Sequence, residues 1–246
     1  MAPKIRRLLH FLLALLLFAG VLYFSLRAMA VHWGPVWGYR QMFWQGWLLT
    51  LALSGASLGC STLVGVLLAM GRRCPWTFVR DVCRIYVELI RGTPLLVQIL
   101  VLFYGVFDQV GITDRFIAGV LILSGFSGAY ISEIVRAGIE SIAGSQWESA
   151  RAIGLSTAQI YRYVIAPQAI RQSLPPLAGQ FASLVKDSSL LSIIGISEFT
   201  LNAQNVNSYT FNALESYLPL ALGYLVITLP ISLWTQALER KLRFEN

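Results

Sequence analysis

Charged residues are what this 246-residue sequence has least of. Asp, Glu, Lys and Arg together make up only 13% of it, 56% of the residues are hydrophobic, and the mean hydropathy is +0.64. An average soluble domain is about 25% charged. A soluble domain of this size could not bury so much apolar surface, because its ratio of surface to volume leaves a large area in contact with water. The shortage of charge therefore excludes an ordinary soluble fold and predicts an integral membrane protein.

Cysteine, histidine and lysine are also scarce. The three cysteines form no CxxC pair, and neither histidine has a second metal-ligand residue nearby. This pattern argues against a zinc site and against a disulfide framework. None of the three lysines follows a glycine, so the sequence has no G-x-x-x-x-G-K-[ST] loop to bind nucleotide phosphates. We therefore do not expect an enzyme, a bound metal or a cofactor in this chain.

Long uncharged windows divide the chain into about six predicted transmembrane helices, which form an all-α polytopic bundle. The first window, residues 8–26, would span about 28 Å as a helix, close to one hydrocarbon thickness. We expect this helix to be retained, although Ala28-Met29-Ala30 leaves a cleaved signal peptide as the alternative. The other windows are residues 46–70, 82–107, 116–136, a stretch that begins near Pro176, and 216–238.

Lysines and arginines predict the orientation of the bundle, because in short loops they gather on the cytoplasmic side. The opposite ends hold only Arg27, Arg40 and Arg115, while Arg91 and Lys186 lie within predicted helices. The remaining fourteen share one set of ends: Lys4, Arg6, Arg7, Arg72, Arg73, Arg80, Arg84, Arg136, Arg151, Arg162, Arg171, Arg240, Lys241 and Arg243. The net charge of +7 therefore marks the cytoplasmic side, with both termini inside, and is not a nucleic-acid footprint.

The longest predicted cytoplasmic loop, about 140–172, contains the signals of two short helices. Ser145-Gln146-Trp147-Glu148 and Ser156-Thr157-Ala158-Gln159 both have the spacing of a capping box. Gly154 lies between them, at a position where a helix ends with φ > 0, and the second helix is expected to end before Pro167. A simple linker does not need these signals. We therefore interpret the loop as a compact docking surface.

The same loop resembles the EAA loop of ABC importer permeases. Glu148-Ser149-Ala150, Gly154-Leu155 and Pro167 reproduce its spacing, with Ser149 where alanine is usual. Residues 87–98, VELIRGTPLLVQ, resemble a signature of polar amino-acid permeases. Two further segments match that subfamily: GAYISEIVR at 128–136 and LVKDSSL at 184–190, where Ser188 replaces a usual threonine. Through these motifs the chain is identified as a member of the polar amino-acid permeases of ABC importers.

The resemblance implies a type I importer fold. Its five-helix core would occupy residues 46–242, after an N-terminal helix and an extracytoplasmic aromatic segment at 1–45 and before a cytoplasmic tail at 243–246. It also implies partners: two ATPase subunits that bind ATP and Mg, a second permease subunit, identical or related, and an extracytoplasmic solute-binding protein. A polar amino acid would be carried inward across the cytoplasmic (inner) membrane of a bacterium.

Polar residues inside the predicted helices are candidates for the substrate pathway or its gate. Gly92 and Pro94 interrupt the third window, and a helix that starts near Pro94 would point free N–H groups at a carboxylate, beside Arg91. The alternative is a kink, with Arg91 reaching toward the cytoplasmic interface. The candidates are Glu88, Arg91, Thr93, Gln98, Lys186, Asp187, Ser188, Glu198 and Asn202.

Lys186 and Glu198 each allow two interpretations. A charge within the membrane costs at least ~3 kcal/mol unless it is paired or wet. Lys186 therefore either meets a substrate carboxylate or an acidic gate residue, or forms an internal ion pair, for example with Glu88. Glu198 and Asn202 are placed near the extracytoplasmic entrance, where we expect Glu198 to lie on a solvated face. Glu133 and Arg136, three residues apart, are expected to pair on one helix face.

Two other classes of protein remain as alternatives. An ion-coupled secondary transporter would also use a broken helix and buried charges, but it would leave the EAA-like loop unexplained, and no inverted repeat is visible. A membrane enzyme would need a convergent catalytic set, and the sequence shows no such constellation of His, Asp, Ser or metal ligands.

Overall fold

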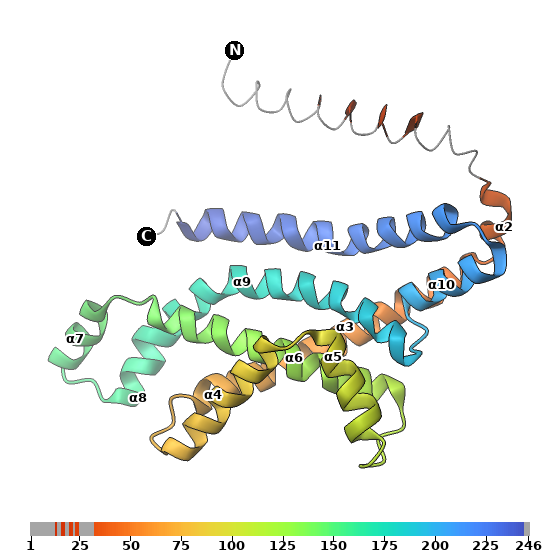
Figure 1. The fold of residues 1–246 in the computed structure, drawn as a ribbon. Helices are drawn as coiled ribbons and strands as arrows, with labels where there is room; N and C mark the ends of the chain where they lie inside the picture. The colour runs from red at the N-terminus through yellow and green to blue at the C-terminus, as the bar shows by residue number, and fades with distance from the viewer. Residues whose placement is uncertain (1–12, 14–15, 18–19, 22, 25–31, 244–246) are drawn as a thin grey trace.

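The computed structural model describes residues 13, 16–17, 20–21, 23–24 and 32–243. All regular structure in this part of the chain is helical, which confirms the predicted all-α class. Figure 1 shows long helices arranged side by side, with shorter helices projecting from one end. The predicted first transmembrane helix, residues 8–26, and the tail at 243–246 lie largely outside the described residues.

Helices α3 (Arg40–Gly71) and α6 (Arg115–Glu140) pack along each other at the centre of the bundle. They approach closely because small residues occupy their contact. A Cβ added at Gly128 would lie 2.7 Å from Val64 Cγ1, closer than packed atoms come. A larger side chain at Gly128 would therefore push the two central helices apart.

Helices α9 (Ala166–Asp187) and α11 (Ala213–Arg243) extend the bundle, with α9 between α6 and α11. The start of α9 differs from the predicted start near Pro176, because the helix already begins at Ala166. Pro175 and Pro176 lie inside it. Neighbouring helices in a membrane bundle can satisfy the backbone groups that such prolines leave free.

The prediction that the preceding helix ends before Pro167 is wrong. A π-helical segment, η2 (Ile160–Ile165), runs directly into α9, and Pro167 occupies the first turn of α9. A proline is tolerated there because its missing N–H falls where the hydrogen bonds change from the wider π register of η2 to that of α9. The segment from α8 (Thr157–Gln159) through η2 to α9 is therefore one continuous helical path.

The third predicted helix is broken, as expected. Helix α4 (Thr77–Gly92) ends at the Thr93-Pro94 step, and α5 (Leu95–Leu100) starts anew and continues as the π-helical η1 (Val101–Phe107). The two halves meet at an angle of 111°. Pro94 has extended backbone and caps α5, so the predicted helix start near Pro94 is confirmed.

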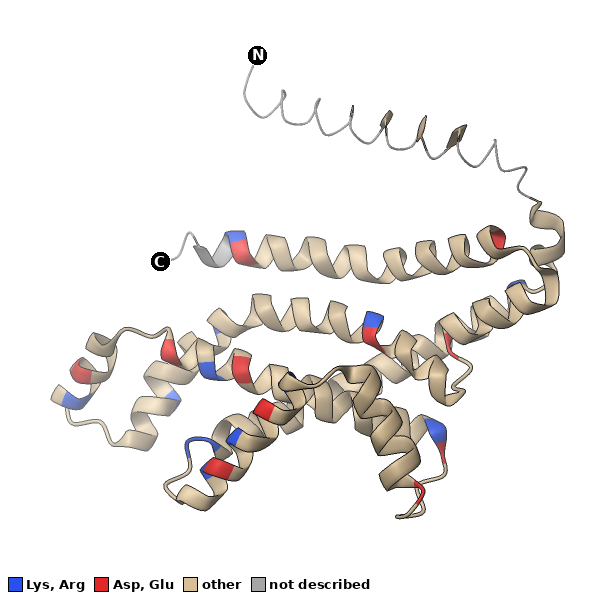
Figure 2. Cartoon of the chain, viewed as in Figure 1, with Lys and Arg blue, Asp and Glu red and all other residues tan. Residues whose placement is uncertain are grey.

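Three described helices, α3, α6 and α11, are long and apolar enough to cross a membrane, or four if the bent pair α4–α5 counts as one crossing. Figure 2 shows that charged residues gather toward the helix ends and in the short connections, while the middle of the long helices carries few. This distribution agrees with a membrane bundle. The predicted count of six crossings stays a prediction.

The remaining elements close the other end of the bundle. A 3-10 helix, η3 (Ser188–Ile194), follows α9, and Gly195 with φ of +74° turns the chain toward α10 (Phe199–Thr210). The short helix α2 (Trp33–Trp37) lies beside α10 and α11. The aromatic segment that the sequence assigns to an extracytoplasmic interface is therefore at the end of the bundle opposite the 140–172 loop (Figure 1).

Candidate functional site

Two short helices joined at a glycine project from the bundle, and we call this unit, residues 143–165, the elbow (Figure 1). Its first helix, α7 (Gly144–Ala152), ends at Gly154, which has φ of +82°. The N–H of Gly154 donates to the carbonyl of Arg151 at 2.9 Å, and the N–H of Leu155 donates to that of Ala150 at 3.2 Å. These two bonds make a Schellman motif, which confirms the predicted role of Gly154.

One of the two predicted capping boxes forms. In α8 (Thr157–Gln159), Ser156 Oγ accepts from the N–H of Gln159 at 3.4 Å, and Gln159 Oε1 accepts from the N–H of Ser156 at 2.8 Å. The box predicted at Ser145 is wrong. Because α7 already begins at Gly144, after the N-cap Ala143, Ser145 lies inside the helix and its side chain caps nothing.

The elbow has a small apolar core of its own. Trp147 and Tyr161 pack edge to face with their ring centroids 5.2 Å apart, and Leu155 packs against the same cluster. The buried members of this cluster are Ile142, Ala150, Ile160, Ile165 and Ala169. This core holds α7 against η2. The elbow is therefore a rigid body rather than a flexible linker.

The outer surface of the elbow combines polar residues with one exposed aliphatic side chain. Glu148, Ser149 and Gly154 are exposed, and Ile153 exposes 76% of its surface at the tip. A fixed helix that presents an isolated aliphatic side chain among polar groups suits contact with another protein. The structure thus brings the EAA-like residues together on one exposed unit, and Pro167 follows in the first turn of α9.

At the break between α4 and α5, the pathway candidates Thr93 and Gln98 form hydrogen bonds with backbone carbonyls. Gln98, which is 8% exposed, donates its amide to the carbonyl of Ile90 at 2.7 Å, to the carbonyl of Thr93 at 3.1 Å and to Thr93 Oγ1 at 2.8 Å. The Thr93 hydroxyl donates to the carbonyl of Leu89 at 2.9 Å. These bonds satisfy carbonyls that the end of α4 leaves free. Gln98 and Thr93 therefore brace the bend.

The brace leads to a first prediction. Replacing Gln98 by Ala removes the donor to two part-buried carbonyls, which costs about 1 kcal/mol for each lost hydrogen bond. We expect a lower midpoint of thermal unfolding for the purified Gln98→Ala protein. Gln204→Ala is the matched control, because Gln204 is exposed on α10. Equal unfolding midpoints for the two variants would contradict the brace.

Arg91 lies on the side of the bend toward α6. Its guanidinium is 3.7 Å from the Glu133 carboxylate and 5.6 Å from the centroid of the Tyr130 ring. Glu133 also binds Arg136, at 2.8 Å, and Arg72. The predicted Glu133–Arg136 pair is thereby confirmed, and it belongs to a larger charge cluster. The predicted position of Arg91 beside a free N-terminus of α5 stays a prediction.

Lys186 and Asp187 are the last two residues of α9. Lys186 is exposed and lines a cavity of about 470 Å³ between α9 and α11, whereas Asp187 is half-buried. Ser188 is buried and donates its hydroxyl to the carbonyl of Val185 at 2.8 Å. The ion pair suggested between Lys186 and Glu88 does not form, since Glu88 lines a different cavity. Among the described residues no carboxylate lies within ion-pair distance of Lys186.

Glu198 is fully buried, so the expectation of a solvated face is wrong. Its carboxylate accepts from the N–H groups of Thr200 and Leu201, both at 2.9 Å, and so caps α10. It also accepts from the Tyr224 hydroxyl at 3.1 Å and the Thr50 hydroxyl at 3.4 Å. Donors from α3, α10 and α11 thus replace the water that a glutamate normally needs.

Asn202 is also buried and connects the same elements. Its side-chain amide donates to the carbonyl of Met42, in α3, at 2.8 Å. The partners Thr50 and Tyr224 could not be predicted from the sequence, because both lie in predicted apolar helices, 148 and 26 residues from Glu198 along the chain. The sequence did offer one signal for a buried site at Glu198: a single carboxylate that follows an apolar stretch and precedes the next helix. Glu198 and Asn202 therefore fix α10 on the bundle rather than line an open entrance.

The pairing of elbow, broken helix and small-residue core can be compared with known proteins. A family model described as "Binding-protein-dependent transport system inner membrane component" matches residues 61–244, most of the chain. The chain belongs to this family. The match confirms the permease class predicted from the elbow and the other motifs.

Relatives of this permease are similar over nearly their whole length. The "Glutamine transport system permease protein GlnP" of Escherichia coli (strain K12) is 35% identical over 218 residues, which cover 87% of this chain and 99% of that protein. The "L-cystine transport system permease protein TcyB" of Bacillus subtilis (strain 168) is 36% identical over 219 residues, covering 87% and 92%.

Solved structures agree with the fold of this permease. The "Crystal structure of an amino acid ABC transporter with histidines" matches with a TM-score of 0.80 and 36% identity, covering 86% of this chain and 99% of that chain. An inward-facing structure of the MetNI methionine ABC transporter matches with a TM-score of 0.66 at 20% identity and covers 84% and 97%. The second likeness shows the fold alone.

Proposed function

We propose that this permease carries a polar amino acid inward as the transmembrane part of an ATP-driven importer. The amino-acid class is supported by relatives named for glutamine and for cystine that share about a third of their residues with this chain. It is also supported by the signature at residues 87–98. Family membership disfavours the alternative, an ion-coupled secondary transporter that works alone.

The observation that carries the proposal is the elbow. It is a rigid, exposed unit with its own apolar core, and it continues directly into α9. We propose that Glu148, Ser149, Ala150, Gly154, Leu155 and Pro167 shape a surface on which a separate ATPase subunit docks. This chain has no G-x-x-x-x-G-K-[ST] loop of its own. ATP and Mg would therefore be bound by the ATPase, and this chain would hold no cofactor.

The proposed assembly follows from this separation of the membrane subunit from the ATPase subunit. Two ATPase subunits would dock below two permease subunits, identical or related, and a solute-binding protein would deliver the amino acid from outside. The membrane would be the bacterial cytoplasmic membrane, with both termini of this chain inside and no role for nucleic acid. Residues 46–242 would be the transporting core, after an N-terminal membrane helix and aromatic segment at 1–45 and before a tail at 243–246.

Uptake into proteoliposomes tests the proposal. The complex of this permease with its ATPase is reconstituted, and entry of labelled glutamine, histidine, arginine and cystine is measured with and without enclosed ATP and added binding protein. We expect uptake of at least one of them only when ATP, ATPase and binding protein are all present. Uptake at the full rate by the permease without any ATPase would instead support a secondary transporter.

Lys186 is the pathway candidate that the structure leaves open for a ligand. Its ammonium lies at the cavity between α9 and α11 and has no carboxylate partner among the described residues, so it could meet the carboxylate that all amino acids share. We expect Lys186→Ala to lower uptake about tenfold or more, equivalent to ~1.4 kcal/mol of a charge-assisted bond. Lys186→Arg, which keeps the charge, should retain more uptake.

Assembly decides between a pathway role and a structural role for Lys186. Size-exclusion chromatography of the variant complex should show the same elution and composition as the unaltered complex. If Lys186→Ala instead prevents assembly, the residue holds the bundle together and the pathway role is refuted.

A further inference from the structure

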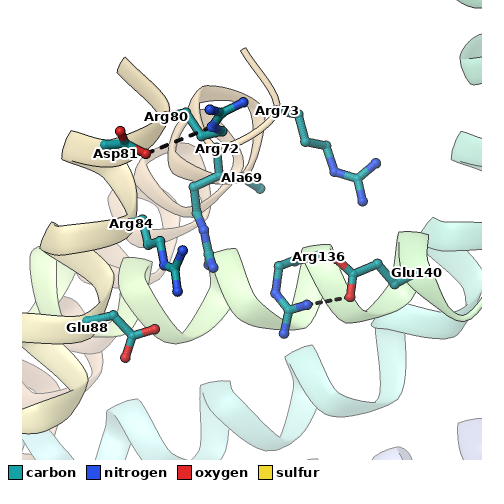
Figure 3. Close-up of a pocket in the computed structure, with 9 residues that line it drawn as sticks. All are labelled: Ala69, Arg72, Arg73, Arg80, Asp81, Arg84, Glu88, Arg136 and Glu140. Carbon is teal, nitrogen blue, oxygen red and sulfur yellow. Dashed lines mark hydrogen bonds and ion pairs between the residues drawn. The ribbon is translucent and has the colours of Figure 1, made fainter. Parts of the chain in front are cut away.

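A second cavity, of about 330 Å³, lies at the predicted cytoplasmic end of α3, α4 and α6 (Figure 3). Five arginines and three carboxylates line it together with Ala69, and we call it the arginine pocket. Its charged members are Arg72, Arg73, Arg80, Asp81, Arg84, Glu88, Arg136 and Glu140. The lining therefore carries a surplus of positive charge. The elbow and the Lys186 cavity do not include these residues.

The charges of the pocket are only partly compensated within the chain. Arg72 and Arg136 are held by Glu133, and Arg136 also binds Glu140. Arg80 is 3.9 Å from the Asp81 carboxylate, at the outer limit of an ion pair. Figure 3 shows Arg84 extending from α4 toward Arg72, while Arg73 lies on the other side of Arg72.

Two of the arginines have no carboxylate partner among the described residues. Arg84 forms no ion pair with any described residue, and Arg73 donates to the hydroxyl of Tyr161, at 3.0 Å. Several guanidinium groups around one cavity repel each other unless an anion lies between them. A phosphate group suits such a site, because arginine donors match its geometry and charge.

The surroundings of the pocket place it at a membrane surface. Helix α4 has two faces: Arg80, Arg84 and Glu88 follow one side, and a stripe of apolar side chains follows the other. The stripe consists of Phe78, Val82, Ile85 and Leu89, which expose 80%, 49%, 58% and 62% of their surfaces. Trp76, at the start of α4, is 73% exposed. An apolar stripe beside a basic face, with an aromatic residue at its end, is typical of the headgroup region.

We propose that the arginine pocket binds the phosphate headgroup of an anionic phospholipid in the cytoplasmic leaflet. The exposed stripe on α4 would contact the surrounding acyl chains, while Arg80 and Arg84 would contact the phosphate of the bound lipid. Basic pockets between transmembrane helices on the cytoplasmic side bind such headgroups in other membrane proteins. The apolar stripe favours a lipid over a soluble phosphate, because a soluble phosphate has no apolar part to contact the stripe.

Native mass spectrometry of the purified full-length chain tests this site. The protein is equilibrated with equal amounts of phosphatidylglycerol and phosphatidylcholine, and the retained lipids are counted. We expect preferential retention of phosphatidylglycerol, and a loss on the order of twentyfold in that preference in the double variant Arg80→Gln, Arg84→Gln, about fivefold for each arginine. The variant Arg80→Lys, Arg84→Lys, which keeps both charges, should retain most of the preference.

Control variants separate a site from a general charge effect. Arg240→Gln removes an exposed arginine on the same side, at the end of α11 and outside the pocket, and should leave the preference unchanged. The proposal is overturned if the double glutamine variant binds phosphatidylglycerol as well as the unaltered protein, or if Arg240→Gln weakens binding equally. Both altered arginines lie at the surface, so an unchanged thermal unfolding midpoint confirms that the variants are folded.

Two further measurements distinguish other ligands. If inorganic phosphate displaces phosphatidylglycerol at millimolar concentration, the ligand is a soluble anion and the lipid site is refuted. If the double glutamine variant loses affinity for the ATPase subunit while its lipid retention is unchanged, the pocket is a protein contact and the proposal fails. Neither measurement requires transport, so the lipid site and the importer function can fail separately.

Discussion

Replacing Gly154 by Val is expected to abolish uptake while the protein is still inserted and folded. Gly154 has φ of +82° at the end of α7, a conformation that is strained for a residue with a branched side chain. The strain costs on the order of 1–3 kcal/mol, enough to open the two Schellman bonds. The tip of the elbow would then change direction, and the ATPase subunit would lose the surface on which we propose that it docks.

The measurement for Gly154→Val is uptake together with substrate-stimulated ATP hydrolysis in proteoliposomes. Both should fall at least tenfold, while insertion into the membrane is unchanged. Gly144→Ala is the matched control, because Gly144 is helical in the same short helix and a Cβ there meets no atom within 4 Å. Normal uptake by Gly154→Val, or equal losses in both variants, would refute the role of the elbow.

Replacing Glu198 by Ala is expected to have the largest effect on stability. The substitution removes the cap of α10 and leaves the buried hydroxyl of Thr50 without its carboxylate acceptor, while Tyr224 keeps only Thr200 as a partner. Loss of a cap costs about 1 kcal/mol. Each buried group left unsatisfied adds about 1–3 kcal/mol. We therefore expect a total loss of about 3 kcal/mol or more in the free energy of unfolding.

Thermal unfolding of the purified permease checks this prediction. Asp114→Ala is the control, because Asp114 caps α6 through one bond of 2.8 Å to the N–H of Ile117 but is exposed. Its loss should cost only about 1 kcal/mol. If the two variants unfold at the same temperature, burial and the hydroxyl partners add nothing to the capping bond of Glu198.

Local signals in the sequence predicted the parts of the fold that depend on a few adjacent residues. The glycine elbow at Gly154, the capping box at Ser156 and the break at Pro94 each arise from backbone preferences of the residues themselves. The same reasoning failed at Ser145, where the serine has the right neighbours. The three-residue connection between α6 and α7 brings the helix start forward to Gly144, and nothing in the capping pattern reveals that.

The environment of the charged candidates could not be predicted, because it depends on residues distant in the sequence. Glu198 is buried by hydroxyls 148 residues before it and 26 residues after it. Arg91 turns to Glu133, on another helix. A sequence shows that a charge lies in an apolar stretch, and therefore that it needs a partner, but packing decides which partner it finds.

The continuity of the elbow with α9 has a mechanical consequence. Helix α9 has 22 residues and is therefore about 33 Å long, with η2 at the docking end and Lys186 at the other. If the helix tilts as one body, a rotation of roughly ten degrees at the elbow shifts Lys186 by about 5 Å. The permease would then need no chain of relayed side-chain movements between its ends, because a single lever joins them.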